Sequence, residues 1–255
     1  MPDRPTIEVL TPPGGWGQPW PSVAEIERVF SHQHWTLVGG LMSQLHCAHA
    51  GISQVRPTND VDMVLHIETE RGLPAAVACA LESLGYKLVV SMDPRDRTAH
   101  RFRRKGSVVD LVTSDDIVDV LTADHAAPSV REPLRGREMI AIEGGTQALR
   151  RTVNAHLVID GQEIVLSVPS PLAAVVLKAA AYQADSRNPE RHLQDAAALL
   201  ACIPDPYEAR ESLKGSDGQR LRLLAEALPD DAQPWRGLDA TRRDDAQAVL
   251  RIMTA

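Results

Sequence analysis

The spacing of apolar and polar residues divides the chain into two unlike halves. In the first half, short apolar runs end at glycine, proline or charged residues, which is typical of strands and turns. One stretch there, residues 72–84, has the i, i+4, i+8 apolar spacing of an amphipathic helix. From about residue 168 the spacing is helical, with breaks at 186–189, 204–206, 215–218 and 229–237. The pattern predicts an α/β (α+β) fold, in which a mixed sheet with flanking helices precedes a C-terminal helical region.

Local signals predict the individual elements. Strands are expected at 36–38, from 55 or 58 to 67, and at 87–91; hairpins are expected at 99–104 with 107–113 and at 150–159 with 163–168. A loop-rich stretch is expected between the two hairpins. Helices are expected at about 22–31 and 41–50, with Ser22 and Glu25 as a capping box, and from Pro171, with Ser170 as the cap. Six prolines in residues 1–22 indicate an extended arm, followed by a core at 23–168 and a helical region at 169–255.

The composition changes this picture little. The chain has 255 residues, 44% of them hydrophobic and only 4% aromatic, so aliphatic side chains must fill a globular core. Three cysteines, Cys47, Cys79 and Cys202, favour reduced thiols and a cytoplasmic protein over a disulfide framework. The apolar runs are too short to span a membrane, and no signal peptide is evident.

The distribution of charge is uneven. The formal net charge is −7, whereas proteins that bind nucleic acid are more often basic. One local run is nevertheless strongly basic and is a candidate surface for RNA or a polyphosphate. Its members are Arg95, Arg97, Arg101, Arg103, Arg104 and Lys105, against the single acid Asp96. The alternative is a hairpin whose outer positions are simply charged and solvated.

The most informative feature is a Gly39-Gly40 turn, followed by a helical run and then by Asp60 and Asp62 on an expected strand. Side chains alternate along a strand, so these two carboxylates point the same way. Neighbouring carboxylates repel each other unless a cation lies between them. Mg²⁺ takes oxygen ligands and keeps substrate phosphates in its shell. The layout is therefore that of a metal-dependent phosphoryl-transfer site.

A third acid, Asp110, lies in the expected strand 107–113 with apolar residues on both sides. Such an acid is costly to bury unless it is paired or binds a metal. If this strand lies beside the strand of Asp60 and Asp62, the three carboxylates could hold two Mg²⁺ ions. Asp110 would then be a ligand or the general base for an acceptor hydroxyl. Alternatively, it caps a neighbour or pairs with an arginine of the run 101–104.

These motifs resemble the nucleotidyltransferase superfamily, and within it the AbiEii-type group, which includes toxins of toxin–antitoxin systems. The second half supports the resemblance with a lysine-bearing helix and a following helix that carries an aspartate. The resemblance spans about residues 36–200. The residues that carry it are Gly39-Gly40, Arg56-x-Thr58-x-Asp60-Val61-Asp62, Val109-Asp110-Leu111, Lys178-x-x-x-Tyr182 and Arg187-x-Pro189-x-Arg191-His-x-x-Asp195.

The resemblance implies a function and a role for each matching position. The implied reaction is Mg²⁺-dependent transfer of a nucleoside monophosphate from an NTP to an acceptor hydroxyl, on RNA such as a transfer RNA, or on a protein. A toxin would also have an antitoxin partner. Metal ligands would be Asp60, Asp62 and Asp110, with Lys178 contacting the nucleotide phosphates and completing the catalytic set. The implied nucleotide-binding residues are Gly39, Gly40, Ser43, Arg56, Thr58, Lys178 and Asp195.

Some alternatives stay open. Lys178 could be a lysine that extends its charge to solvent, and Asp195 could form only an i,i+4 salt bridge with Arg191. Leu41 stands where the family usually has Ser or Thr, and Ser43 follows two residues later. Leu41 favours a module that binds nucleotides without turnover. A further alternative is an enzyme that modifies aminoglycoside-like small molecules, which an acidic pocket beside the metal site would favour.

Overall fold

The computed structural model describes residues 4–52, 56–93, 95–105 and 115–255, and it has the mixed α/β architecture that the sequence predicts. A six-stranded mixed sheet forms its centre. Its strands, in spatial order, are β2 (Trp35–Val38), β3 (Asp60–Leu65), β6 (Asp116–Ala123), β5 (Arg101–Arg104) and β4 (Lys87–Leu88), and β7 (Ala141–Ile142) pairs with the end of β6. β3 and β6 are parallel, whereas β2 and β5 run antiparallel to their neighbours.

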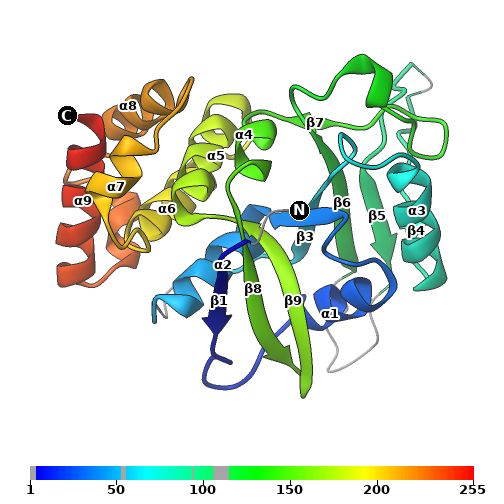
Figure 1. Ribbon diagram of the computed structural model, residues 1–255, viewed down its shortest axis with the longest axis horizontal. Helices are drawn as coiled ribbons and strands as arrows, with labels where there is room; N and C mark the ends of the chain where they lie inside the picture. Colours follow the sequence, from blue (N-terminus) through cyan, green and yellow to red (C-terminus); the bar gives the residue numbers. More distant parts are fainter. Residues whose placement is uncertain (1–3, 53–55, 94, 106–114) are drawn as a thin grey trace.

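A second sheet of three strands is built by the expected hairpin and the N-terminal arm (Figure 1). The hairpin consists of β8 (Thr152–Ile159) and β9 (Gln162–Pro169), and β1 (Thr6–Val9) lies parallel to β8. Asp160 and Gly161 both have positive φ, 50° and 75°, as the two-residue turn of a twisted hairpin requires. The prediction of this hairpin is confirmed, and the arm contributes a strand.

Helices surround the sheets and form the C-terminal side of the molecule (Figure 1). In the first half these are α1 (Trp20–Val29), α2 (Gly39–His49), α3 (Leu73–Ser83), the short η1 (Pro128–Val130) and α4 (Gly145–Leu149). In the second half they are α5 (Pro171–Ala184), α6 (Glu190–Leu200), α7 (Pro206–Glu211), α8 (Asp217–Ala227), η2 (Gln233–Gly237) and α9 (Ala240–Thr254). The predicted breaks between the C-terminal helices are confirmed.

Two of the expected helix caps have different outcomes. The Ser170 hydroxyl accepts a hydrogen bond from the Ala173 amide at 3.4 Å, so it caps α5 as predicted. The capping box at Ser22 is wrong: α1 begins at Trp20, and Ser22 is buried in its first turn. Pro19 and Pro21 set this earlier start, because proline is well tolerated in the first turn of a helix.

One strand differs from expectation. β5 confirms the first arm of the hairpin expected at 99–104, while residues 107–113 lie outside the described residues. The strand that pairs with β5 is β6, within the stretch expected to be rich in loops, so that expectation is wrong here. β6 is buried along its last six residues and lies in the middle of the sheet.

The cores are mostly aliphatic, as the low aromatic content predicts, but Trp35, Tyr86, Phe102 and Trp235 are among the largest fully buried side chains. One hydrophobic cluster joins the two sheets to α1 and α3, and a second joins α2 to the C-terminal helices. The helix α2 contributes to both clusters, through Leu41 to the first and Met42 to the second. This helix therefore fixes the position of the sheet against the C-terminal region. No helix of the described residues is long and apolar enough to cross a membrane.

Candidate functional site

The turn from β2 to α2 is shaped around the next strand. Gly39 has a φ of +70°, and a Cβ added there would lie 1.8 Å from Oδ2 of Asp62. A Cβ on Gly40 would lie 2.8 Å from the Cβ of Thr58. Both glycines are therefore required by close approach, and Gly39 also by its backbone conformation. The Gly-Gly turn and the Thr58-x-Asp60-x-Asp62 segment, separate in the sequence, form one packed unit.

The first turn of α2 offers few side-chain donors. Leu41 is fully buried in the hydrophobic core. Ser43 is also fully buried, and its hydroxyl donates to the carbonyl of Gly39 at 3.4 Å. The role of Ser43 in nucleotide binding stays a prediction, and it would require this hydrogen bond to break.

Two acids of β3 and one of β6 form a carboxylate cluster, comprising Asp60, Asp62 and Asp119. The two on β3 share a face of the sheet, and Asp119 lies directly beside Asp62 in the parallel β3–β6 register. Sequence reasoning missed Asp119 and chose Asp110, which lies outside the described residues. The sequence Val118-Asp119-Val120 carries the same apolar–acid–apolar signal as the segment around residue 110.

The members of the carboxylate cluster have different partners. Asp119 accepts two hydrogen bonds from Arg101, at 2.8 Å from Nε and 2.7 Å from Nη2. The same guanidinium lies 4.0 Å from Asp60. Asp62 accepts no hydrogen bond from any residue that the structure describes. Burial raises the pKa of Asp62 to about 7, with Asp119 as the second cause. Burial followed by Asp119 also raises the pKa of Asp60, against the opposing effect of Arg101.

The donors suit a hard divalent cation only in part. Among the described residues, no three Asp, Glu, His or Cys side chains are arranged to hold a metal ion. Asp119 already uses both oxygens on Arg101. Asp60 and Asp62 offer carboxylate oxygens as metal ligands. Asp62 is half-buried beside two other acids, and no described residue donates a hydrogen bond to it. A cation bound by this pair would supply the positive charge that Asp62 lacks.

An ionic network lies close enough to the cluster to act on its carboxylates. The Lys178 ammonium on α5 is 2.6 Å from Oδ2 of Asp195 on α6, and the two side chains are only 4% and 2% exposed. Arg56 donates to both oxygens of the same carboxylate, each at 3.2 Å. The alternative readings are wrong, because Lys178 does not reach solvent and Arg191 pairs with Asp185 instead. The positive charge of Lys178 opposes the rise in the Asp62 pKa.

We expect Lys178→Met to lower the free energy of unfolding by about 3 kcal/mol, because it leaves the Asp195 carboxylate buried with one partner fewer. Urea denaturation followed by circular dichroism measures the effect. The double variant Lys178→Met/Asp195→Leu removes both buried charges and should recover most of the loss, while Arg56 can be hydrated. If the double variant is as unstable as Lys178→Met, the loss of stability does not come from the broken ion pair.

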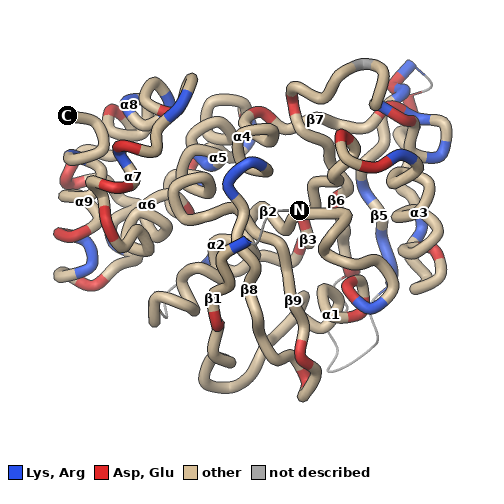
Figure 2. The backbone as a smooth tube through the Cα atoms, in the orientation of Figure 1, with Lys and Arg blue, Asp and Glu red and all other residues tan. Residues whose placement is uncertain are grey.

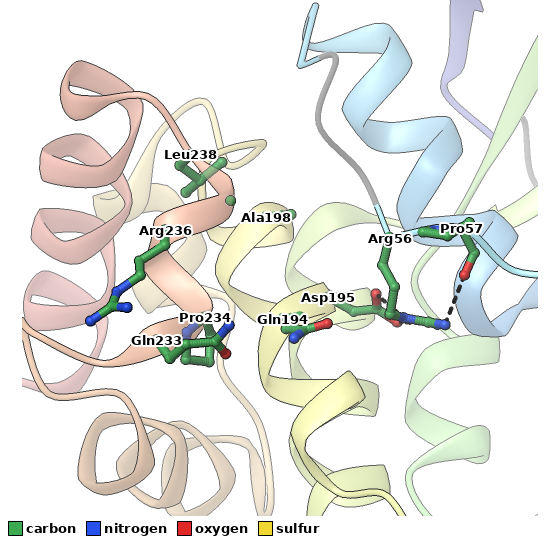
Figure 3. A pocket seen from close by; sticks show the side chains of 10 residues that line it. Arg56, Pro57, Gln194, Asp195, Ala198, Gln233, Pro234, Arg236 and Leu238 are labelled. Carbon is green, nitrogen blue, oxygen red and sulfur yellow. Dashed lines mark hydrogen bonds and ion pairs between the residues drawn. The ribbon is translucent and has the colours of Figure 1, made fainter.

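An open pocket of about 550 Å³ lies where this network meets the C-terminal region (Figure 3). Figure 3 shows Arg56 and Pro57 at one end of the lining, to which α6 contributes Gln194 and η2 contributes Gln233. Its residues are Arg56, Pro57, Gln194, Asp195, Ala198, Gln233, Pro234, Arg236, Gly237 and Leu238. Asp195 is the only acid among the described residues of this lining, and Lys178 and Arg56 already neutralise its charge. The pocket therefore combines apolar surface, amide groups and excess positive charge.

The basic run near β5 is largely paired with acids. Figure 2 shows the basic residues of β5, which are all arginines, with Asp and Glu of neighbouring segments nearby. The ion pairs are Arg95 with Asp93, Arg101 with Asp119, Arg103 with Asp115, and Arg104 with Asp116 and Glu25. Such pairing lowers the potential that a phosphate backbone would meet. The ion pairs favour the alternative that this run is a charged, solvated face of the strand. An RNA-binding role for the run stays a prediction.

Comparison with solved structures identifies the fold. The chain resembles the crystal structure of an antigenic nucleotidyltransferase-like protein from Paracoccidioides brasiliensis, with a TM-score of 0.51 over 90% of this chain and 91% of that chain. The sequence identity is 16%. No protein-family model matches the sequence, and no curated protein matches it either. The likeness shows a nucleotidyltransferase-like fold, which confirms the predicted fold class; the AbiEii-type subgroup stays a prediction.

Proposed function

We propose that this protein is a nucleotidyltransferase that moves a nucleoside monophosphate from an NTP to an acceptor hydroxyl, with a divalent cation held by Asp60 and Asp62. The observation that carries the proposal is the packing of Gly39 against the Asp62 carboxylate, within a fold of the nucleotidyltransferase-like kind. A glycine with φ of +70° at this contact brings backbone and carboxylate together at the start of α2. Amide groups at a helix start bind phosphate oxygens, and acids beside them bind the accompanying cation.

The proposed reaction is a displacement at the α-phosphorus of the NTP. The acceptor oxygen forms a bond to the α-phosphorus, the bond to the leaving pyrophosphate breaks, and the hydroxyl proton passes to water. A Mg²⁺ ion would offset the charge that develops on the phosphate oxygens. The chain itself would orient the triphosphate at the start of α2. Lys178 and Arg56 would supply positive charge near the carboxylates, held in place by Asp195.

The pocket at Arg56 supports an anionic substrate over a polycationic one. The Arg56 guanidinium lies in its lining, whereas the Arg236 guanidinium points away from the other labelled side chains in Figure 3. The one acid among the described lining residues already has two cationic partners. An aminoglycoside needs acidic surface, which this lining does not supply. The glutamines Gln194 and Gln233 donate and accept hydrogen bonds, as recognition of a nucleobase edge requires. We therefore favour RNA, such as a transfer RNA, as the acceptor, and place a protein hydroxyl second.

A toxin role would follow from the same chemistry if the acceptor is essential to translation. Growth arrest on induction of the wild-type protein, but not of an Asp62→Asn variant, would support that role. Normal growth with both proteins at equal abundance would count against it. A rescuing antitoxin could then be sought among proteins that relieve the arrest.

A second candidate function is nucleotide binding without turnover, and one observation favours it. Leu41 is buried and the Ser43 hydroxyl is bonded to Gly39, so the first turn of α2 presents no free hydroxyl from these two positions. Phosphate binding there would depend on backbone amides alone. Such a site would bind an NTP but align its α-phosphorus less firmly.

The deciding experiment incubates the protein with Mg²⁺ and each of four α-labelled NTPs, together with total RNA, cell protein or an aminoglycoside. Label in RNA supports the favoured reading, label in protein its second acceptor, and label on the aminoglycoside the small-molecule reading. Equilibrium dialysis with the same NTPs detects binding without transfer, which would support the non-catalytic module. Chelation with EDTA and the Asp62→Asn variant must both remove the label. Transfer that survives either control would contradict the proposed site.

A further inference from the structure

We propose that Arg101 is a built-in cation of the carboxylate cluster, which takes the place of a second metal ion and limits this chain to one bound divalent cation, at Asp60 and Asp62. The inference rests on the proposed function for the location of the site. It differs from the two-metal arrangement that the sequence motifs suggest, because it assigns the third carboxylate to a protein group.

Strand pairing fixes the position of Arg101. β6 lies between β3 and β5. In the strand register Asp119 is paired with Asp62 of β3 on one side and with Arg101 of β5 on the other. Residues paired across neighbouring strands direct their side chains to the same face of the sheet. Arg101 therefore reaches the carboxylate cluster as a consequence of sheet register and not of a loop conformation.

The contact with Asp119 uses the whole carboxylate. The distances of 2.8 and 2.7 Å are those of a two-pronged arginine–carboxylate pair, in which each oxygen accepts one hydrogen bond. The Asp119 side chain is only 9% exposed. A metal ion that used Asp119 would have to compete with this pair in a setting largely screened from water. The hydrogen bonds to Asp119 also raise the pKa of Arg101, so the guanidinium keeps its charge.

The charge count matches a single ion. Three carboxylates and one guanidinium leave two negative charges, which one divalent cation neutralises. The Arg101 guanidinium lies 2.7 Å from Asp119 and 4.0 Å from Asp60, so one protein cation is within ion-pair distance of two of the three acids. Without a nucleotide, a second divalent ion in addition to Arg101 would leave these three carboxylates with a net charge of +2.

The test is a titration with Mn²⁺, which prefers the same oxygen ligands as Mg²⁺ and gives an electron paramagnetic resonance signal when free in solution. We expect one Mn²⁺ per wild-type chain, and a second ion, or overall binding at least about tenfold tighter, in Arg101→Gln. Arg103→Gln is the matched control, because Arg103 lies on the same strand and pairs with the more exposed Asp115. This control loses the same charge and should bind one ion as the wild type does.

Folding is followed in parallel by circular dichroism. If Arg101→Gln does not fold, the double variant Arg101→Gln/Asp119→Asn, which removes both charges, should bind one ion with unchanged affinity. The inference is overturned if the wild type binds two ions or none, if Arg101→Gln binds as Arg103→Gln does, or if the double variant loses affinity by tenfold. Two ions together with label transfer would overturn this inference alone. Binding of one ion without transfer of label would contradict the proposed function but would agree with this inference.

Discussion

Replacing Asp62 with Asn is expected to lower nucleotide transfer by about 1000-fold or more, and to raise the melting temperature of the metal-free protein at pH 8. The first effect follows because a catalytic cation contributes several kcal/mol to transition-state stabilisation, and 4 kcal/mol corresponds to about 1000-fold. The second follows because the Asp62 carboxylate is half-buried, accepts no hydrogen bond from the described residues, and lies beside Asp119. A group that destabilises the folded protein while it serves the reaction is characteristic of a functional site.

The pH dependence gives the sign of the stability effect. The pKa of Asp62 rises from the ordinary 3.8 to about 7 in the folded protein, so the native state holds this proton more tightly than the unfolded state. Its destabilising effect is absent below about pH 4, grows between pH 4 and 7, and is complete above pH 7. Asparagine carries no charge, and solvent reaches the half-buried site, so we discount the full effect of the pKa shift to about 1 kcal/mol. The advantage of asparagine should then be about 2–4 °C at pH 8 and should vanish at pH 4.

Asp217→Asn is the matched control for a carboxylate with a structural role. The Asp217 side chain is 0% exposed, and its partner Arg151 lies 2.9 Å away. Breaking this pair should lower the melting temperature at pH 8, opposite in sign to Asp62→Asn. Differential scanning calorimetry without metal compares the two variants, and added Mg²⁺ should stabilise the wild type but not Asp62→Asn. A lower melting temperature for metal-free Asp62→Asn at pH 8 would contradict the account.

Local signals predicted the parts of the site that local geometry controls. The Gly39-Gly40 turn, the strand with Asp60 and Asp62, and the cap at Ser170 each depend on residues close together in the sequence. Glycine φ preferences, the two-residue period of a strand and capping all act over a few residues. These elements were therefore predictable without knowledge of the tertiary structure.

Asp119 was not predictable in the same way. Val109-Asp110-Leu111 and Val118-Asp119-Val120 carry one pattern, and only the pairing of β6 with β3 places Asp119 beside Asp62. No local signal encodes which distant strands become neighbours. Aspartates also flank β6, and aspartate is disfavoured in strands, so this segment resembled a loop in the sequence. These residues are Asp115 and Asp116 at its start and Asp124 just after its end.

The second helical motif shows a similar limit. The sequence predicted the helices that became α5 and α6, but the alternatives for Lys178 and Asp195 could not be resolved from helical spacing. Their contact depends on the packing of two helices and on Arg56, which arrives from the loop before β3. Burial is what decides the matter: a lysine 4% exposed must have an anionic partner, and Asp195 is that partner.

Gly39→Ala is expected to lower the free energy of unfolding by about 4 kcal/mol and to reduce nucleotide transfer to background. About 1–2 kcal/mol comes from an L side chain at φ of +70°, and the rest from overpacking against Asp62. The new Cβ would lie 2.9 Å from the Asp62 Cβ, so rotation of the carboxylate cannot relieve the overlap and the strand must shift. Urea denaturation and the label-transfer assay measure the two effects.

Two further variants separate strain from overlap. Gly15 has a similar φ of +82° with nothing within 4 Å of an added Cβ, so Gly15→Ala should cost only the 1–2 kcal/mol of strain, with transfer unchanged. In Gly39→Ala/Asp62→Gly the overlapping side chain is gone, so about 1–2 kcal/mol should return while transfer stays at background. Equal losses in Gly15→Ala and Gly39→Ala would show that the backbone of α2 does not press against the carboxylate. The proposed site would then lose the contact that carries it.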